Sequence, residues 1–366
     1  NIIVGNSAVH SWQAWWQGLG HGIRPLLKAS YTLDWSLGGG TPVGFHLTNL
    51  LIHVGNGLLV WRLSILLLRQ SELLARHAAA VGFVTALLFV LHPVHTEAVS
   101  YISGRSSSLM TLFYLGGMLC HLIGRQRESP GFLHLATPLL FLAALATKET
   151  AITFPLALLL VHVTSGGSWR SALAQSWSSW LVAIASLLYF LHDTSYSTHL
   201  QRSLNLHDGW SAVALQIHAL AYLLSQWCWP LSLNIDPDLR STEASSWQAA
   251  LLLGILLAAM GVRHQLRQRC WLGFALSWLL LHLLLVYVFA PRVDIANERQ
   301  LYLVSWPLLL ALTAELALWL PRRSFVLATT GLVILAGGIT VLRNEDYRSE
   351  LALWQATVVH SPDKAR

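Results

Sequence analysis

The sequence predicts an all-α membrane protein that crosses the bilayer about ten times. Only 11% of its 366 residues are charged and 54% are hydrophobic, whereas a soluble domain typically carries about 25% charged residues. Apolar stretches near the length that crosses about 30 Å of hydrocarbon recur along the whole chain. Because so little polar surface cannot enclose a soluble core, we predict a polytopic helical bundle.

The apolar stretches place the predicted spans in chain order. The shorter ones must extend into their flanks or cross a thinned bilayer, because a helix rises only about 1.5 Å per residue. The apolar segment 209–231 is interrupted by Gln216, His218 and a Trp pair, so we interpret it as a span or as a re-entrant or interfacial helix. The predicted spans lie at roughly 46–68, 78–92, 108–123, 132–146, 151–164, 177–192, 247–262, 271–289, 305–320 and 325–342.

The connectors between these spans are of two alternating kinds. One set is short and basic ("RQSELLARH", "GRQRES", "SGGSWRS", "RHQLRQRC", "PRRS"), with ten Lys and Arg and only Glu72 and Glu128 as acids. The other set is much longer in total and holds fourteen Asp and Glu. Because excess Lys and Arg mark cytoplasmic loops, the short set is predicted in the cytoplasm and the functional groups on the outer face. The alternation closes only if 209–231 does not span once by itself, which favours the re-entrant interpretation.

Charge and cysteine content argue against other classes of protein. The net charge of +6 comes without a basic run or a nucleic-acid motif, and basic residues commonly flank spans, so no nucleic-acid partner is predicted. The three cysteines are widely spaced and form no CxxC pair, which indicates neither a disulfide framework nor a zinc site. The absence of an N-x-S/T sequon favours a bacterial origin.

The loop "HPVHTEAVSYISGRSS" (92–107) combines His92, His95, Glu97 and Arg105. It lacks the spacing of a helical HExxH motif, and zinc sites typically need three or four convergent ligands, so metal binding is the minority alternative. We expect Glu97 and Arg105 to reach into a polar cavity, with the two histidines in support. The alternative is capping at the membrane interface, with the arginine snorkelling and Glu97 binding backbone amides.

Two further segments place polar groups at predicted outer ends of spans. Arg24 precedes a proline that suits the start of an interfacial helix. His46, Asn49 and His53 recur at three and four residues, so they share a helical face, either as a direct site or as an interhelical hydrogen-bond network. "TKET" places Lys148 beside a glutamate with hardly any loop. Adjacent residues on a helix project in different directions, so each is expected to find its own partner, with Lys148 a candidate ligand for a lipid phosphate or an ordinary snorkelling lysine.

The segment "APRVDIANERQLYLVSWP" offers Arg292, Asp294, Glu298 and Arg299 at the entry to a span. If it is helical, Asp294, Glu298 and Tyr302 share a face and Arg299 points elsewhere. The planar fork of arginine suits phosphate, so we predict a phosphate contact for Arg299. The alternative is an interfacial anchor assisted by the aromatic residues that follow.

Taken together, these loops resemble the transmembrane O-mannosyltransferase family with tetratricopeptide repeats (TMTC-like), part of the GT-C superfamily. The resemblance covers essentially the whole chain. It implies a GT-C-type transmembrane domain at 1–342, with 1–45 as an incomplete first outer loop, and an outer-face tail at 343–366 that opens a repeat array. The matching stretches, in order, are "IIVGN", "RPLLKASYTLDW", "FHLTNLLIH", "HPVHTEAVSYISGRSS", "TKETAIT", "WPLSLNIDPDL", "NERQLYLVSWP" and "TVLRNEDYRSELALWQATVVHSPDKAR".

The resemblance implies a transferase that moves a sugar, typically mannose, from a polyprenyl-phosphate carrier to Ser or Thr hydroxyls of exported protein, with inversion, on the outer face. The family's catalytic acid precedes the segment that matches "IIVGN", so we expect it before Asn1, and Asp34 is not promoted in its place. The family's "GRAD"-like end of the second outer loop reads "GRSS" here, so no role is carried over for that acid. Glu97 is therefore the supporting acid, and the predicted substrate-binding residues are Arg24, His46, Arg105, Lys148, Glu298 and Arg299.

No firm cofactor and no metal ligand are predicted, and a divalent metal is left open. The expected partners are the lipid-linked sugar donor, an exported protein acceptor and membrane lipids. A bacterial inner membrane with the long loops in the periplasm is preferred to an endoplasmic reticulum membrane with luminal loops. The alternatives are a non-catalytic scaffold, a transporter or an envelope-lipid transferase, although no internal repeat of the transporter kind is detected.

Overall fold

The computed structural model describes residues 3–19, 23–192, 201, 209–239, 269–285, 295–362 and 364. Regular structure within these ranges is helical throughout, which confirms the all-α prediction. The predicted span 247–262 and the predicted contributors Arg292 and Asp294 lie outside them. The chain divides into two compact units: unit 1 is Asn1–Leu59, Ala98–Leu159 and Ser168–His199, and unit 2 is Val60–Glu97, Leu160–Gly167 and Leu200–Arg366.

Apolar helices occupy each predicted span that falls in the described ranges, which confirms a multi-pass membrane protein. Five helical segments there are long and apolar enough to cross a bilayer, and a sixth candidate is bent by 53° at its break. Three shorter apolar helices cover the predicted spans 132–146, 151–164 and most of 271–289. The five are α3 (Pro42–Leu68), Ile102–Gln126 with α6 (Arg105–Gln126), α9 (Trp169–His192), Glu298–Trp319 with α15 (Leu301–Trp319), and α16 (Arg322–Asp346). The bent pair is Ala75–Leu91 with α4 (Ala78–Leu91) and Pro93–Val99 with α5 (Thr96–Val99), and the shorter helices are Phe132–Leu145, Glu149–Thr164 and Cys270–Leu284.

Unit 1 begins with two helices that precede the first span, α1 (Trp12–Gln17) and α2 (Pro25–Gly38). Pro25 occupies the first turn of α2, as predicted, because proline fixes a helical φ where its missing N–H is not needed. Gly39 ends α2 in the left-handed region at φ 60°. The buried core of this part of unit 1 consists of Ile3, Val9, Leu27, Tyr31, Phe45, Ile52 and Leu109.

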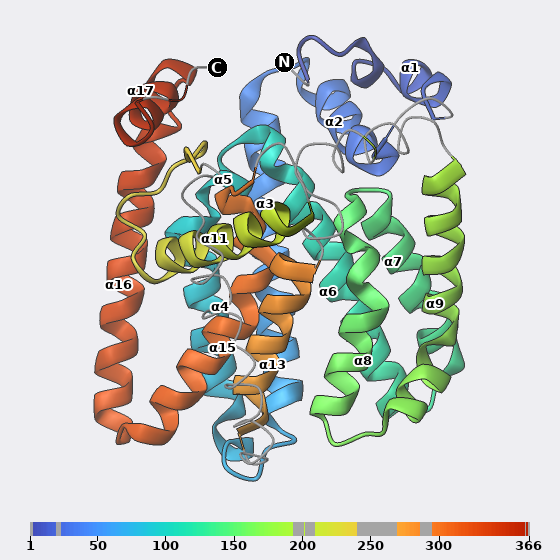
Figure 1. Cartoon of the computed structure of the whole chain (residues 1–366), viewed down its shortest axis with the longest axis vertical. Helices are drawn as coiled ribbons and strands as arrows, with labels where there is room; N and C mark the ends of the chain where they lie inside the picture. Colours follow the sequence, from blue (N-terminus) through green and yellow to red (C-terminus); the bar gives the residue numbers. More distant parts are fainter. Residues whose placement is uncertain are drawn as a thin grey trace. The chain divides into compact units, whose positions relative to one another are not determined.

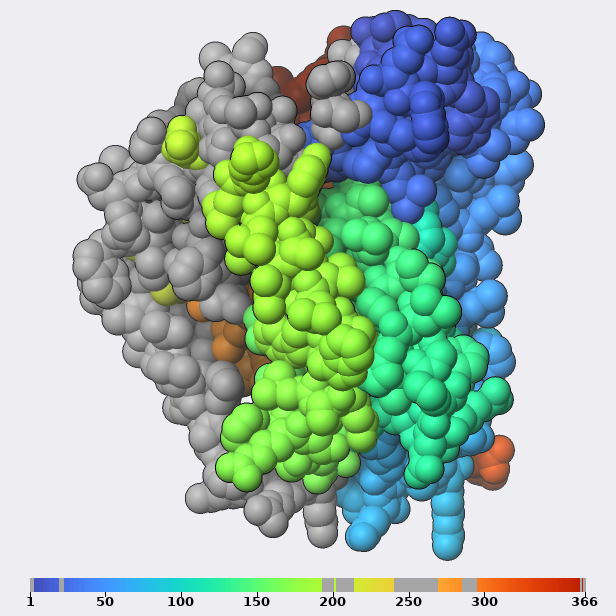
Figure 2. All heavy atoms as spheres, turned by 90° about the vertical axis from the view of Figure 1, so that its right-hand side faces the viewer, coloured from blue at the N-terminus to red at the C-terminus, as the bar shows by residue number. Residues whose placement is uncertain are grey.

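The remaining helices of unit 1 are α7 (Thr137–Leu145), which a π-helical turn at Phe132–Ala136 precedes, the first part of α8 (Phe154–Thr164), and α9. Of these, α7 packs against α6, and α9 packs against α7 and the turn before it. Figure 2 shows α9 as a continuous strip along the face of unit 1 turned to the viewer. Its exposed apolar side chains suit lipid contact; they include Trp169, Trp177, Leu181, Ile184 and Leu188.

Unit 2 is built around α4, α13 (Cys270–Leu279) and α15, and α15 packs against both of the others. The contacts of α15 with α4 and with the second half of α3 are polar as well as apolar. The Thr85 and Thr313 hydroxyls lie 2.6 Å apart, and the Trp306 indole N–H donates to Ser64 over 3.0 Å. Such interhelical hydrogen bonds are typical of membrane bundles, because lipid tails are as apolar as the helix surfaces and apolar contact alone does not favour helix association.

Helix α11 (Gly209–Cys228) runs across the direction of α4, α13 and α16 in Figure 1. It packs Ala219, Leu220 and Leu223 into a buried cluster with Val94 and Leu301. This transverse course favours the re-entrant or interfacial interpretation of 209–231.

The chain ends with α17 (Glu350–His360), which Ser349 caps by accepting from the Ala352 N–H. After α17, Ser361 bonds back to the segment that follows α11: its hydroxyl accepts from the Asn234 side chain over 2.7 Å. The Lys364 ammonium lies 2.6 Å from the Asp236 carboxylate. These contacts fasten the tail to unit 2, and the boundary at 342/343 stays a prediction.

Candidate functional site

The predicted outer loops of unit 1 meet at one end of its helices. The Leu26 N–H donates to the Ala146 carbonyl over 3.0 Å, and the Tyr31 hydroxyl donates to the Ile102 carbonyl over 3.2 Å. The first loop, the second loop and "TKET" are therefore in direct contact, as their grouping by charge predicts.

Arg24 and Glu149 form a two-point ion pair at this end. The Arg24 guanidinium donates to the two carboxylate oxygens over 2.9 and 2.6 Å, with the two side chains 21% and 34% exposed. Arg24 also holds a left-handed backbone at φ 59°, which is uncommon for a residue other than glycine. The pair therefore holds the Arg24 guanidinium at a partly exposed position of unit 1.

Lys148 turns inward from the same turn. Its side chain is buried and its ammonium donates to the Ser107 hydroxyl over 2.7 Å. The expectation that Lys148 and Glu149 find separate partners is therefore confirmed.

Arg105 is completely buried and is surrounded by protein acceptors. Its guanidinium donates to the Asn49 amide oxygen over 2.6 Å and to the carbonyls of Ser30 and Phe45 over 3.1 and 2.9 Å. It lies 2.5 Å from the Asp34 carboxylate. Arg105 thus joins α2, α3 and α6 from inside, so a substrate contact of Arg105 has no support in this geometry.

His46 departs from the predicted polar face of α3. Asn49 and His53 are buried, and Asn56 continues that buried face by donating to the Ser108 carbonyl over 2.8 Å. His46 is exposed because it stands near the start of α3, where residues 41–43 are also exposed. The buried part of the stripe is an interhelical hydrogen-bond network, one of the two alternatives that the sequence leaves open.

In unit 2, Glu97 and Arg299 form the second candidate pair. The backbone N–H of Arg299 donates to one Glu97 oxygen over 2.8 Å, and the Arg299 side chain lies 3.4 Å from the other. Glu97 is 1% exposed and Arg299 is 21% exposed. The buried carboxylate therefore holds the turn that begins α15, while the guanidinium extends toward the surface of the unit.

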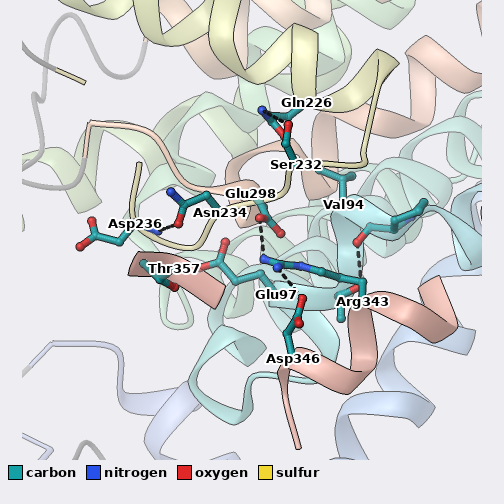
Figure 3. Close-up of polar contacts among 12 residues, drawn as sticks. Val94, Glu97, Gln226, Ser232, Asn234, Asp236, Glu298, Arg343, Asp346 and Thr357 are labelled. Carbon is teal, nitrogen blue, oxygen red and sulfur yellow. Dashed lines mark hydrogen bonds and ion pairs between the residues drawn. The ribbon is translucent and has the colours of Figure 1, made fainter. Parts of the chain in front are cut away.

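Glu298, the neighbour of Arg299, is held from another direction by Arg343, which the sequence analysis does not single out. Figure 3 shows the Arg343 guanidinium between the Glu298 and Asp346 carboxylates, and both contacts measure 2.9 Å. Arg343 is buried near the C-terminal end of α16. The signal in the sequence is an arginine three residues before Asp346 at the end of an apolar stretch.

Tyr347 adjoins this cluster just beyond α16. Burial raises the pKa of its phenol well above the usual range, and the carboxylates of Glu298 and Glu97 raise it further. Arg343 lies 5.4 Å from the centre of its ring. The phenol is therefore neutral at physiological pH.

The two histidines of the second loop make aromatic contacts. A His95 ring nitrogen lies 2.6 Å from the Phe89 carbonyl, and the rings of His95 and Tyr302 are 4.7 Å apart. The His92 ring stacks on Trp227 at 5.5 Å. Within the described ranges, no group of three or more His, Cys, Asp and Glu is arranged to hold a metal ion.

The chain is 23% identical to Protein O-mannosyl-transferase F38B6.6 of Caenorhabditis elegans, over 94% of the chain and 49% of that protein. It is 40% identical to Protein O-mannosyl-transferase Tmtc2 of Drosophila melanogaster over 39% of the chain and 15% of that protein. It is 32% identical to human Protein O-mannosyl-transferase TMTC4 over 36% of the chain and 19% of that protein. Its curated relatives are protein O-mannosyl-transferases. The resemblance predicted from the loop motifs is thereby confirmed.

The chain spans about half the length of the first of these relatives and less than a fifth of the other two. No family model matches it, and no solved structure matches it either. Arg24, His46, Arg105 and Lys148 belong to unit 1, and Glu97, Glu298 and Arg299 to unit 2, so their common cavity stays a prediction.

Proposed function

We propose that this chain carries the membrane part of an O-mannosyl-transferase that uses a polyprenyl-phosphate sugar as donor. The acceptor is a Ser or Thr hydroxyl of an exported protein, and the reaction takes place on the outer face with inversion. Support comes from the relatives named O-mannosyl-transferases and from the multi-pass helical fold.

The reaction makes two demands on the protein. The hydroxyl oxygen of the acceptor forms a bond to the anomeric carbon while the bond from that carbon to the phosphate oxygen breaks. A base takes the hydroxyl proton, and the lipid phosphate leaves with the electron pair. A cation held in place beside that phosphate stabilises the charge that develops.

The donor assignment depends on one observation, which is the position of Arg299. Its side chain is partly exposed, and its backbone and Nε are held by the buried Glu97. Because Glu97 already holds this arginine, binding a ligand costs little further side-chain conformational entropy. The planar guanidinium can donate to two oxygens of one phosphate. We assign Glu97 to holding Arg299, which is a supporting role.

Within unit 1, Arg24 is the candidate for a second headgroup contact because its pair with Glu149 is partly exposed. Lys148 is buried against Ser107, so it would act on a phosphate only from inside the unit. The preferred setting is a bacterial inner membrane with the long loops in the periplasm, and an endoplasmic reticulum membrane is the alternative.

The test of the function uses membranes that contain the full-length protein. They receive polyprenyl-phosphate [³H]mannose and a Ser/Thr-rich acceptor protein, with vector-only membranes as control. We expect label that is bound to the acceptor, is released by alkaline β-elimination and has the inverted anomeric configuration. No transfer above the control, with transfer from another polyprenyl-linked sugar, would overturn the mannose assignment.

Replacement of Arg299 tests the phosphate contact. Arg299→Ala is expected to weaken donor binding by at least about tenfold, because a charged hydrogen-bond partner is lost. Arg348→Ala is the matched control, since Arg348 forms an exposed pair with Glu345 at the same end of unit 2. Unchanged donor affinity in Arg299→Ala would remove Arg299 from the donor site.

A further inference from the structure

We infer that Arg343 is a positioning residue for the donor-phosphate contact: through Glu298 it fixes the turn that presents Arg299. The inference rests on the proposed function, because it takes Arg299 as the group that contacts the phosphate. It reassigns Glu298, predicted to bind substrate, to an internal contact.

The turn that begins α15 is held from two directions. Glu97 accepts from the backbone N–H of Arg299, and Arg343 donates to one carboxylate oxygen of Glu298 over 2.9 Å. Glu97 and Glu298 are both almost completely buried. The side chain of Arg299 is the partly exposed member of this group, so the turn that the two buried carboxylates hold carries an arginine that reaches the surface of unit 2.

Arg343 is itself fixed along its helix. Its second contact, with Asp346, joins it to the last turn of α16, and three residues earlier the Thr340 hydroxyl donates to the Leu91 carbonyl over 2.7 Å. Leu91 ends α4, immediately before the loop that carries Glu97. The C-terminal end of α16 therefore contacts the Arg299 turn through Arg343 and the end of α4, next to the Glu97 loop, through Thr340.

Because the buried Arg343 guanidinium contacts two carboxylates, it fixes the orientation of the Glu298 side chain as well as its distance from α16. Lysine keeps the charge but is a point donor, so it does not reproduce a fork that reaches Glu298 and Asp346 together. Removal of Arg343 alone leaves Glu298 buried and unpaired, which destabilises any fold irrespective of function. A useful variant must therefore remove the contact and the unpaired charge together.

The experiment measures the Kd of the purified full-length protein for a fluorescent polyprenyl monophosphate, with the unphosphorylated polyprenol as a chain-only reference. The variants are Arg343→Lys and the double variant Arg343→Met with Glu298→Gln, which leaves no unpaired buried charge at this contact because Asp346 is 34% exposed and Glu97 keeps its pair with Arg299. Arg348→Gln is the control at an exposed pair nearby. Thermal unfolding is followed in parallel.

We expect the double variant to unfold near the wild-type temperature and yet to bind the monophosphate about tenfold more weakly, with polyprenol binding unchanged. Arg343→Lys should be intermediate, and Arg348→Gln should match wild type. Monophosphate affinity at the wild-type level in both Arg343 variants would overturn the inference and leave the donor assignment intact. Equal affinity of the wild-type protein for monophosphate and polyprenol would overturn the donor assignment, and the inference with it. If the double variant does not fold, Arg343→Lys decides the question by the same comparison.

Discussion

At the scale of single residues, three arginines that pair with carboxylates separate into one internal support and two partly exposed residues. Arg105 is enclosed by acceptors from α2 and α3 and has no exposed atoms to offer a ligand. Arg24 and Arg299 are each paired with one carboxylate and are each 21% exposed. Chemical type alone does not distinguish these roles, since all three are arginines in predicted outer segments.

Loss of the Arg105 side chain is expected to be severe. Arg105→Leu leaves Asp34 buried without its cation, at a cost of about 3–5 kcal/mol in the free energy of unfolding. Adding Asp34→Asn should recover part of the loss. Thermal unfolding in detergent measures both, and an unchanged unfolding temperature in Arg105→Leu would contradict the role as an internal support.

Glu149→Gln provides the comparison. It breaks the Arg24 pair, but solvent reaches both partners, so the expected loss is below about 1 kcal/mol. A loss as large as that of Arg105→Leu would mean that exposure does not rank the two pairs.

The sequence predicts part of these contacts for a physical reason. Lys148 and Glu149 are adjacent, so their divergence follows from helix geometry alone. The pairs of Arg105 with Asp34 and of Glu298 with Arg343 join residues far apart in the chain, and they depend on how helices pack. Hydropathy locates a helix and does not say which of its faces meets which neighbour.

At the scale of elements, α6 packs against its neighbours by means of a glycine. A Cβ added at Gly117 would lie 3.0 Å from the Phe154 ring and 3.4 Å from the Leu140 Cβ. A Cβ at the adjacent Gly116 would meet the Leu140 side chain at 3.7 Å, an ordinary contact. Two neighbouring glycines in one helix thus face different amounts of space.

Substitution of these glycines tests the packing of α6. Gly117→Ala should destabilise the protein by about 1–3 kcal/mol, because the added methyl overpacks the contact with α7 and α8. Gly116→Ala should be neutral or slightly stabilising, since alanine favours a helix more than glycine does. The difference in unfolding temperature between the two variants is the measurement. Equal effects would show that the Phe154 ring yields without cost.

Span positions were predictable, but local helix geometry was not. The predicted span 132–146 begins as a π-helical turn at Phe132–Ala136 and becomes α-helical only from Thr137. Pro138 has no N–H to donate to the preceding turn, and the Thr137 hydroxyl bonds to the Phe132 carbonyl over 2.7 Å. Mean hydropathy along the sequence reflects neither the missing N–H of a proline nor the hydrogen bond of a threonine side chain.

At the scale of the whole molecule, the alternation of loop charge predicts which connectors lie together. In unit 1 the three predicted outer segments contact one another, and in unit 2 the Glu97 loop, the Arg299 turn and α16 do so. Within unit 2, residues at the opposite ends of α3, α8 and α13, namely Gln70, Ser165 and Cys270, line a common pocket. The division of the chain into two units was not predictable, because it depends on the density of contacts and not on sequence order.

Cysteine labelling tests the predicted sidedness. In a background with the three native cysteines replaced by serine, Ser36→Cys stands on the predicted outer face and Glu128→Cys in a predicted cytoplasmic loop, and both positions are exposed. A membrane-impermeant maleimide should label Ser36→Cys in intact spheroplasts and Glu128→Cys only after permeabilisation. The reverse pattern would invert the topology and move the proposed site to the cytoplasm.

The anchoring of α16 has a mechanical consequence. This helix has 25 residues, which corresponds to about 37 Å of length, and only 11% of its most apolar window is buried inside the protein. Its apolar stretch, between Arg323 and Arg343, matches a bilayer core of about 30 Å, so a change in the thickness of that core is expected to change the tilt of the helix. Since its C-terminal end is fastened at Thr340 and Arg343, we expect acyl-chain length in the surrounding membrane to shift the turn that carries Arg299.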